Sequence, residues 1–419
     1  MKRVLLALSL VFFLSGCLFI KPISFSNTTA GRFVRVDLKS PGRHDISVMF
    51  NGELIENISL SQDQDHFYFF AKNPGVYDVI VDDEKFSVRV SPPEWQVFIW
   101  MAADNNLRDY ASEDIAEISD YGIRTSVLVF FDGVRDEVLA MSDEGLRVLK
   151  TVDINSGSGK ELRDFINEFS IDLSKKFLVI WDHGSSWLGD SNYKNDFTTR
   201  AVALDEESKD ALTIPELSEA LDGLKFDLLG FDACFMGSVE VIYQLRRVAR
   251  YIIASGDYEP GSGWDYSFLK DLNGSSIEVA KSVLDRYSDY IESFSEYLES
   301  DHRWSLSIFN TTKVDELASK FKDFANEIST PAVRNLAYEL ENEDPYKRYI
   351  KNVEEVLKAY TDPKPILGDV IVYYWTNGGY PMNILLPNPG ELGEIYDSYY
   401  DLEFASDTGW LEYLKEAGL

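Results

Sequence analysis

Cysteine is the scarcest informative residue type in this chain of 419 residues. Only two are present, Cys17 and Cys234. A framework of disulfide bonds, on which many small exported domains depend, is therefore excluded. Hydrophobic residues make up 45% of the chain and aromatic residues 14%, which is enough to bury a sizeable core. The length favours two or three domains rather than one.

Basic residues are also in short supply. Lys and Arg number 40 against 71 Asp and Glu, which gives a formal net charge of −31. This charge argues against nucleic acids and anionic membrane surfaces as partners. It suits a solvated secreted or surface protein, towards which a positively charged peptide would be steered. The same acidity also serves solubility alone, so charge by itself does not choose a function.

The only strongly apolar run at the start of the chain is too short to cross a bilayer comfortably. Lys2-Arg3 precede the apolar stretch Val4–Leu14, and Leu14-Ser15-Gly16-Cys17 follows, which is the layout of an export signal. The last four residues resemble the bacterial lipobox, in which the cysteine is lipidated. We therefore expect a signal peptide at 1–17, a lipid on Cys17, a tether at 18–30 and a place on the cell envelope. The alternative is a plain signal peptide or anchor with a chance cysteine.

Several functional motifs are missing. The sequence has no phosphate-binding loop, no zinc-ligand spacing, no EF-hand order of acidic residues and no internal repeat. It predicts no required cofactor or metal. A serine hydrolase remains an alternative, but the Gly-x-Ser-x-Gly elbow of such enzymes is absent.

Residues 31–92 alternate between apolar and polar side chains in short segments separated by turn signals. Arg32–Leu38 and Asp45–Phe50 are examples, and Asn51-Gly52 is a strong hairpin signal. About seven such strands predict an immunoglobulin-like β-sandwich without a disulfide. No catalytic grouping occurs in it, and we interpret it as a spacer or recognition module. Ser91–Glu94 then reads as a linker.

Residues 95–419 alternate apolar strand patterns with helical ones. The strands are expected near Trp95–Trp100, Ser126–Phe131, Phe177–Trp181, Leu228–Phe231, Tyr251–Ser255, Trp304–Phe309, Val370–Trp375 and Met382–Leu386. The helices are expected near 107–119, 159–169, 276–299, 315–328, 331–341 and 346–360, with another after Gly237. This alternation predicts an α/β fold with a mostly parallel sheet and helices on both faces. Ligands of such sheets bind beyond the carboxyl ends of the strands.

Two of these strand ends carry a nucleophile and a base. Phe177–Trp181 runs into Asp182-His183-Gly184, and Leu228–Phe231 runs into Asp232-Ala233-Cys234. A cysteine with a histidine beside it in space is the combination needed for nucleophilic catalysis. We expect the following helix to lower the pKa of the Cys234 thiol through its amino terminus. The alternative is that Cys234 is an inert buried cysteine.

The chain resembles the clostripain-like cysteine peptidases, within the superfamily of caspases, gingipains and legumains. The resemblance rests on His183-Gly184, on Asp232–Gly237, on Met101–Leu107, and on Ala254–Asp257 with Gly261–Trp264. It covers roughly Trp95 to the end of the sequence, and it implies a caspase-like fold. It also implies that Cys234 attacks the peptide carbonyl, that His183 protonates the leaving nitrogen, and that the backbone N–H groups of Gly184 and Cys234 bind the oxyanion.

The resemblance further implies cleavage after Arg or Lys, with a carboxylate in the pocket for that side chain. Asp232 is the first candidate and Asp257 the second, although each also suits a cap or turn. Asp182 either orients His183 or faces solvent, and Trp187 and Trp264 either wall the pocket or pack in the core. Relatives are often self-cleaved between the catalytic residues, so we expect a cut after Lys194 or Arg200. Calcium activates some relatives and stays an open question here.

Together these features predict a cysteine endopeptidase that cleaves peptides or proteins after basic residues and is held at the cell envelope by lipid. The main alternative is a non-catalytic surface binding protein that keeps a peptidase fold. The natural substrate and the oligomeric state do not follow from the sequence.

Overall fold

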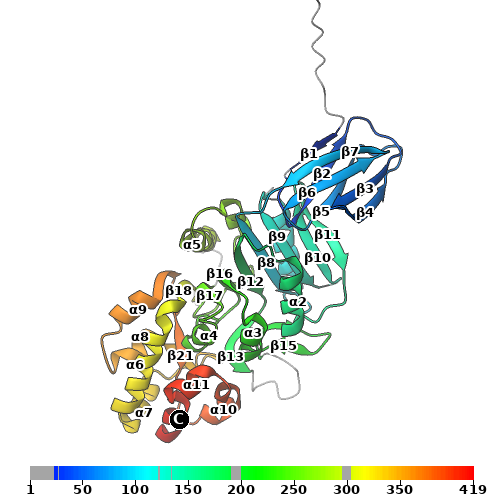
Figure 1. The fold of residues 1–419 in the computed structure, drawn as a ribbon. Helices are drawn as coiled ribbons and strands as arrows, with labels where there is room; N and C mark the ends of the chain where they lie inside the picture. The colour runs from blue at the N-terminus through cyan, green and yellow to red at the C-terminus, as the bar shows by residue number, and fades with distance from the viewer. Residues whose placement is uncertain (1–22, 27, 121–122, 134, 190–199, 295–302) are drawn as a thin grey trace, which may run out of the picture.

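The computed structural model describes residues 23–26, 28–120, 123–133, 135–189, 200–294 and 303–419. A small β-domain lies at one end of the molecule, and a larger α/β domain forms the rest (Figure 1). This confirms the predicted fold class. No helix in the described ranges is both long and apolar enough to cross a membrane.

The small domain is a sandwich of two antiparallel sheets, with strand orders β1-β2-β5 and β4-β3-β6-β7. Its strands are β1 Ile23–Phe25, β2 Arg32–Leu38, β3 Asp45–Phe50, β4 Glu53–Ser59, β5 His66–Ala71, β6 Gly75–Val81 and β7 Glu84–Val90. Asn51 and Gly52 join β3 to β4 with φ of 52° and 84°, as a tight hairpin turn requires. The tether expected at 18–30 is shorter than predicted, because Ile23–Phe25 pairs with Val36–Leu38.

The α/β domain is built on a nine-stranded sheet of order β11-β10-β9-β8-β12-β16-β17-β18-β20. The five central strands are parallel, and antiparallel strands extend the sheet on both sides. The strands are β8 Trp95–Ala102, β9 Ser126–Asp132, β10 Glu137–Ser142, β11 Gly145–Thr151, β12 Lys175–Trp181, β16 Phe226–Asp232, β17 Ala249–Ala254, β18 Ser305–Asn310 and β20 Ile371–Thr376. The hairpin β10–β11 was not expected from the sequence.

Helices cover both faces of this sheet, as predicted. Those whose apolar residues join one core are α2 Gly159–Phe169, α3 Ile214–Leu221, α4 Val239–Gln244, α6 Val314–Glu327, α7 Thr330–Glu339, α8 Val353–Lys358, α9 Lys364–Val370, α10 Leu392–Tyr400, α11 Glu403–Thr408 and α12 Trp410–Ala417. The core on the other face includes α1 Arg108–Asp120, the short 3-10 helix η1 Tyr266–Asp271 and α5 Ser276–Phe294. The nine-stranded sheet is therefore covered by helices on both faces.

Two small sheets lie outside the main one. β13 Gly184–Gly189, β14 Arg200–Asp205 and β15 Asp210–Leu212 form the first, directly after His183. β19 Ile350–Asn352 and β21 Asn383–Leu385 form the second. The helix expected over 346–360 is therefore wrong in its first half, because residues 350–352 pair with a strand far along the chain.

Candidate active site

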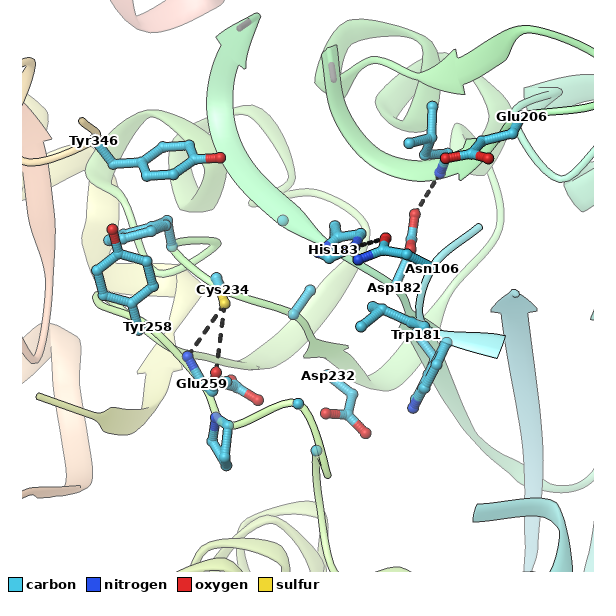
Figure 2. Close-up of a pocket in the computed structure, with 18 residues that line it drawn as sticks. Asn106, Trp181, Asp182, His183, Glu206, Asp232, Cys234, Tyr258, Glu259 and Tyr346 are labelled. Atoms are coloured by element: carbon cyan, nitrogen blue, oxygen red, sulfur yellow. Dashed lines mark hydrogen bonds between the residues drawn. The ribbon is translucent and has the colours of Figure 1, made fainter. Parts of the chain in front are cut away.

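The register of two neighbouring strands brings His183 and Cys234 to one cleft. β12 and β16 run parallel, with Trp181 paired to Asp232, and His183 and Cys234 each follow two residues later. The backbone N–H of Asp182 donates to the carbonyl of Asp232 at 3.3 Å, which extends the pairing. Both side chains line the same cleft of about 400 Å³ (Figure 2). The structure thus brings together the two residues predicted to be catalytic.

Gly184 lies against the backbone of Cys234. A Cβ atom at Gly184 would overlap the carbonyl oxygen of Cys234 and would lie 3.1 Å from its amide nitrogen. The two amides predicted to bind the oxyanion therefore belong to segments in direct contact. The same contact leaves no room for a side chain at position 184.

A tight turn presents the thiol. Phe235 has a φ of 62°, and its N–H donates to the carbonyl of Asp257 at 2.8 Å. Its ring packs edge-on against Tyr258 and stacks on Tyr346, with centroids 4.5 Å and 5.1 Å away. This packing holds a backbone conformation that non-glycine residues rarely adopt, and such strain is common at functional sites.

His183 is held by a residue to which the sequence assigned no role. Its Nε2 lies 2.7 Å from Oδ1 of Asn106, which follows β8 (Figure 2). Because an amide oxygen only accepts hydrogen bonds, this contact places a proton on Nε2 and leaves Nδ1 as the unprotonated nitrogen. Burial lowers the pKa of His183. The imidazole is therefore neutral at rest near pH 7.

Asp182 does not face solvent. Its buried carboxylate accepts from Nδ2 of Asn105 at 2.8 Å and from the backbone N–H of Leu204. Nδ2 of Asn105 also donates to the carbonyls of Ala102 and Leu204, both at 3.1 Å. Asp182 therefore fixes the loop that carries Asn106, and it also contacts the backbone N–H of His183.

The expected lowering of the thiol pKa is wrong. Burial, together with the acidic side chains of Glu259, Asp257 and Asp232, raises the pKa of Cys234 to about 12. Helix α4 is capped by Ser238, four residues beyond Cys234, so its amino terminus does not reach the sulfur. The N–H of Glu259 donates to Sγ at 3.2 Å, a smaller effect in the opposite direction. The resting pair is a neutral thiol and a neutral imidazole.

Asp232 lies at the buried base of the cleft. Its Oδ2 accepts from the N–H of Trp264 at 3.2 Å and from the hydroxyl of Tyr266 at 3.0 Å. Burial raises its pKa to about 7. Gly263, with φ of 58°, comes so close that a Cβ there would lie 2.7 Å from Oδ1. Asp232 is therefore a shielded carboxyl group that lines the cleft.

The structure does not bring Asp257 into this cleft. Its carboxylate has no exposed surface and forms an ion pair with Lys347 at 2.8 Å, while the N–H of Tyr380 donates to it at 2.9 Å. Glu259, two residues further along, lines the cleft instead. Both residues sit in the same acidic loop, so the sequence offered no signal that separates them.

The two tryptophans are core residues. Trp187 is buried and packs edge-on against Tyr399 with a centroid distance of 4.5 Å. Trp264 is buried in the opposite core and contributes only its backbone N–H to Asp232.

The sequence profile of the clostripain family, peptidase family C11, matches residues 99–362. This chain belongs to the clostripain family. Over 131 residues it is 30% identical to clostripain from Hathewaya histolytica, a match that spans 28% of this chain and only 24% of that protein.

Solved structures of the family share its fold. An inactive zymogen C11 protease from Parabacteroides distasonis matches with a TM-score of 0.63 and 22% identity, over 77% of this chain and 99% of that one. A secreted C11 cysteine protease from Bacteroides thetaiotaomicron, solved with an irreversible peptide inhibitor, matches with a TM-score of 0.60 and 22% identity, over 76% and 99%. The larger domain is thus a C11 peptidase fold.

The predicted lipidation and self-cleavage sites lie outside the described residues or next to their ends. Cys17 and Lys194 lie outside the described residues. Arg200 is the first residue of β14, and its backbone pairs with Gly189 of β13. Within the described ranges, no group of three or more His, Cys, Asp or Glu side chains is arranged to hold a metal ion.

Proposed function

We propose that this clostripain-family chain is a cysteine endopeptidase that cleaves after Arg or Lys. The observation that carries the proposal is the shared cleft, where His183 and Cys234 stand above the buried carboxylate of Asp232. A carboxylate in a shielded site pairs strongly with a guanidinium or an ammonium group. A basic side chain held there places the following peptide bond beside the thiol.

The resting protonation states define the first chemical step. Nδ1 of His183 takes the proton of the Cys234 thiol as the sulfur attacks the carbonyl carbon. The N–H groups of Gly184 and Cys234 stabilise the negative oxygen that forms. The imidazolium then gives its proton to the leaving nitrogen. Water, deprotonated by His183, hydrolyses the thioester and releases the acid.

Replacement of the nucleophile tests the activity. Cys234→Ala removes the attacking sulfur, and we expect turnover of peptide-coumarin substrates with Arg or Lys before the coumarin to fall about a thousandfold or more. An Arg- or Lys-based fluoromethyl ketone should form an adduct on Cys234 of the unaltered protein. Full turnover by Cys234→Ala contradicts the proposal, and an inert unaltered protein without an adduct favours the non-catalytic binding protein.

We also propose that the chain cleaves itself after Lys194 or Arg200, which separates His183 and Cys234 onto two fragments. Both positions lie in or beside the polar connection between β13 and β14. Purified protein should then give two bands, whereas the Cys234→Ala variant should give one. Identical single bands contradict self-cleavage.

Anchoring by lipid on Cys17 is the third proposal. The pattern Leu14–Cys17 supports it, and residues 18–22 separate that cysteine from β1. The sandwich would then stand between the membrane and the peptidase domain. A Cys17→Ser variant should move from the detergent phase to the aqueous phase on detergent partitioning. Retention of that variant in the detergent phase contradicts a lipid on Cys17.

A further inference from the structure

Glu259 is a buried acid on the wall of the cleft with no well-aligned hydrogen bond. It is 8% exposed, and in the described part of the chain neither of its carboxyl oxygens has a partner of good geometry. A buried carboxyl group without partners is costly, and proteins retain few of them. The carboxyl group of Glu259 would therefore be stabilised by a bound ligand or by a proton.

The neighbour of Glu259 is a second acid. Its carboxyl adjoins that of Asp232, and the indole of Trp264 lies beside Glu259 (Figure 2 shows Glu259 and Asp232 below the histidine and the cysteine). Two carboxylates in contact repel each other, so one of them takes up a proton, through which the two can hydrogen bond. The shared proton therefore gives the carboxyl group of Glu259 a hydrogen-bond partner in Asp232.

The acids, tyrosines and thiol around this pair supply no positive charge. Asp114 and Glu117 face it from α1, Tyr266 from η1 and Tyr287 from α5, with the Cys234 thiol above. Lys347 is the cation nearby, and it already pairs with Asp257. No charge among these groups is therefore free to neutralise a doubly ionised pair.

We propose that Glu259 and Asp232 form one cation-binding floor, which holds a single proton when the cleft is empty and releases it when a basic side chain enters. This inference rests on the proposed function, and it adds Glu259 as a residue that determines specificity. The entering guanidinium or ammonium replaces the proton between the two carboxylates. One proton passes to solvent for each cation bound.

Release of a proton links affinity to pH. Binding of the cation becomes stronger as pH rises, because less free energy is needed to remove the proton, and it weakens as pH falls. Burial raises the pKa of Asp232 to about 7, and burial followed by the charge of Asp232 raises that of Glu259 well above its usual range. The shared proton therefore resides mainly on Glu259.

Competitive inhibition by benzamidine, an aromatic amidine that stays cationic, tests the proposal. Its Ki is measured against an Arg-coumarin substrate from about pH 7.5 to 9. For the unaltered enzyme we expect Ki to fall with rising pH by up to about tenfold per unit. For Glu259→Gln, which keeps the size of the side chain, we expect Ki to change less than about twofold over the range.

Two matched variants assign the proton. Glu206→Gln removes an exposed carboxylate at the cleft and should keep the pH dependence of the unaltered enzyme. Asp114→Asn removes a buried acid that neighbours Asp232 but does not line the cleft, and it should also keep it.

Three results would overturn the inference while leaving the proposed function intact. The Ki of the unaltered enzyme could be independent of pH, or Glu259→Gln could keep the pH dependence of the unaltered enzyme. The third result is that Asp114→Asn alone loses the pH dependence of Ki. If Glu259→Gln does not fold, the pH dependence of Ki is compared between the unaltered enzyme and Asp114→Asn. A dependence that both proteins share supports the inference. Failure of the proposed function gives a different result, in which no substrate with a basic residue is cleaved.

Discussion

Asn106 supports the histidine of the proposed catalytic pair. Its Oδ1 holds Nε2 of His183 at 2.7 Å, and Asn105, anchored on Asp182, keeps the loop in place. A neutral acceptor fixes the tautomer of the imidazole without adding a full charge. Asn106 is a positioning residue, since it acts on the reaction through His183.

Replacing Asn106 should therefore affect kcat more than KM. We expect Asn106→Ala to lower kcat about tenfold to 100-fold with KM nearly unchanged, because the proton-transferring nitrogen loses its orientation. Asn106→Asp restores an acceptor and adds a negative charge, which stabilises the imidazolium and raises the pKa of His183. The acid limb of the kcat/KM profile should then move to higher pH.

Steady-state kinetics of both variants across pH check this prediction. Leu107→Ala, a change in the next residue of the same loop, serves as a control for lost packing at the cleft, which Leu107 also lines. Equal losses in kcat and 1/KM for Asn106→Ala, with no movement of the acid limb in Asn106→Asp, would speak for a purely structural role.

The choice between Asp257 and Glu259 illustrates how far residues can be assigned from sequence. Both are acidic and lie two positions apart in one loop, so pattern and charge rate them alike. Lys347, 90 positions further along, neutralises Asp257, and the turn of the loop aims Glu259 at the cleft. Contacts between distant segments made this distinction.

At the scale of elements, the ends of β12 and β16 form the site. The parallel register of β12 and β16 places His183 and Cys234 at equivalent positions beyond the strand ends. Gly184, which has no side chain, allows its segment to contact the backbone of Cys234. The strands themselves were predictable, because apolar runs bounded by turn signals mark buried parallel strands. The contact at Gly184 also agrees with the role expected of a residue without a side chain.

A methyl group at Gly184 should separate the two segments. We expect Gly184→Ala to lower kcat/KM about 100-fold, because its Cβ would overlap the carbonyl of Cys234 and displace the thiol from the imidazole. Gly368→Ala is the matched control, since no atom lies within 4 Å of a Cβ there. That change sits in helix α9 and should stabilise the fold by about 0.5–1 kcal/mol. Equal activity of the two variants would contradict the close contact.

Elements that depend on distant partners were the ones missed. Residues 350–352 occur within a helical pattern, yet they pair with residues 383–385 as β19 and β21. Propensity is a weak prior, and tertiary pairing overrides it over such short lengths.

At the scale of the whole molecule, a buried arginine fastens the sandwich to the peptidase domain. Arg32 of β2 is fully buried, and its guanidinium donates to the carbonyls of Ile123 and Thr125 and pairs with Asp143 at 2.8 Å. Burial lowers the pKa of Arg32, and the Asp143 carboxylate opposes that effect. The sandwich is therefore packed on the sheet edge and does not hang from a free linker.

Removal of this guanidinium should weaken the whole molecule. We expect Arg32→Met to destabilise the protein by about 3 kcal/mol, because two carbonyls and a carboxylate lose their buried donor. Arg35→Met is the control: Arg35 pairs with Asp37 and Glu144 in a more exposed setting, where such pairs contribute about 1 kcal/mol or less. Thermal unfolding of both variants measures the difference, and equal midpoints would argue against a fastening role for Arg32.

The sequence by itself determined the central strands, several of the helices that flank them and the placing of a histidine and a cysteine at strand ends, since apolar periodicity and turn residues act locally. Only the tertiary structure decided the protonation of the thiol, the acids that reach the cleft and the support of His183 by Asn106. Each of these depends on burial and on partners from remote segments, and solvation and charge interactions are set by distance in space rather than along the chain.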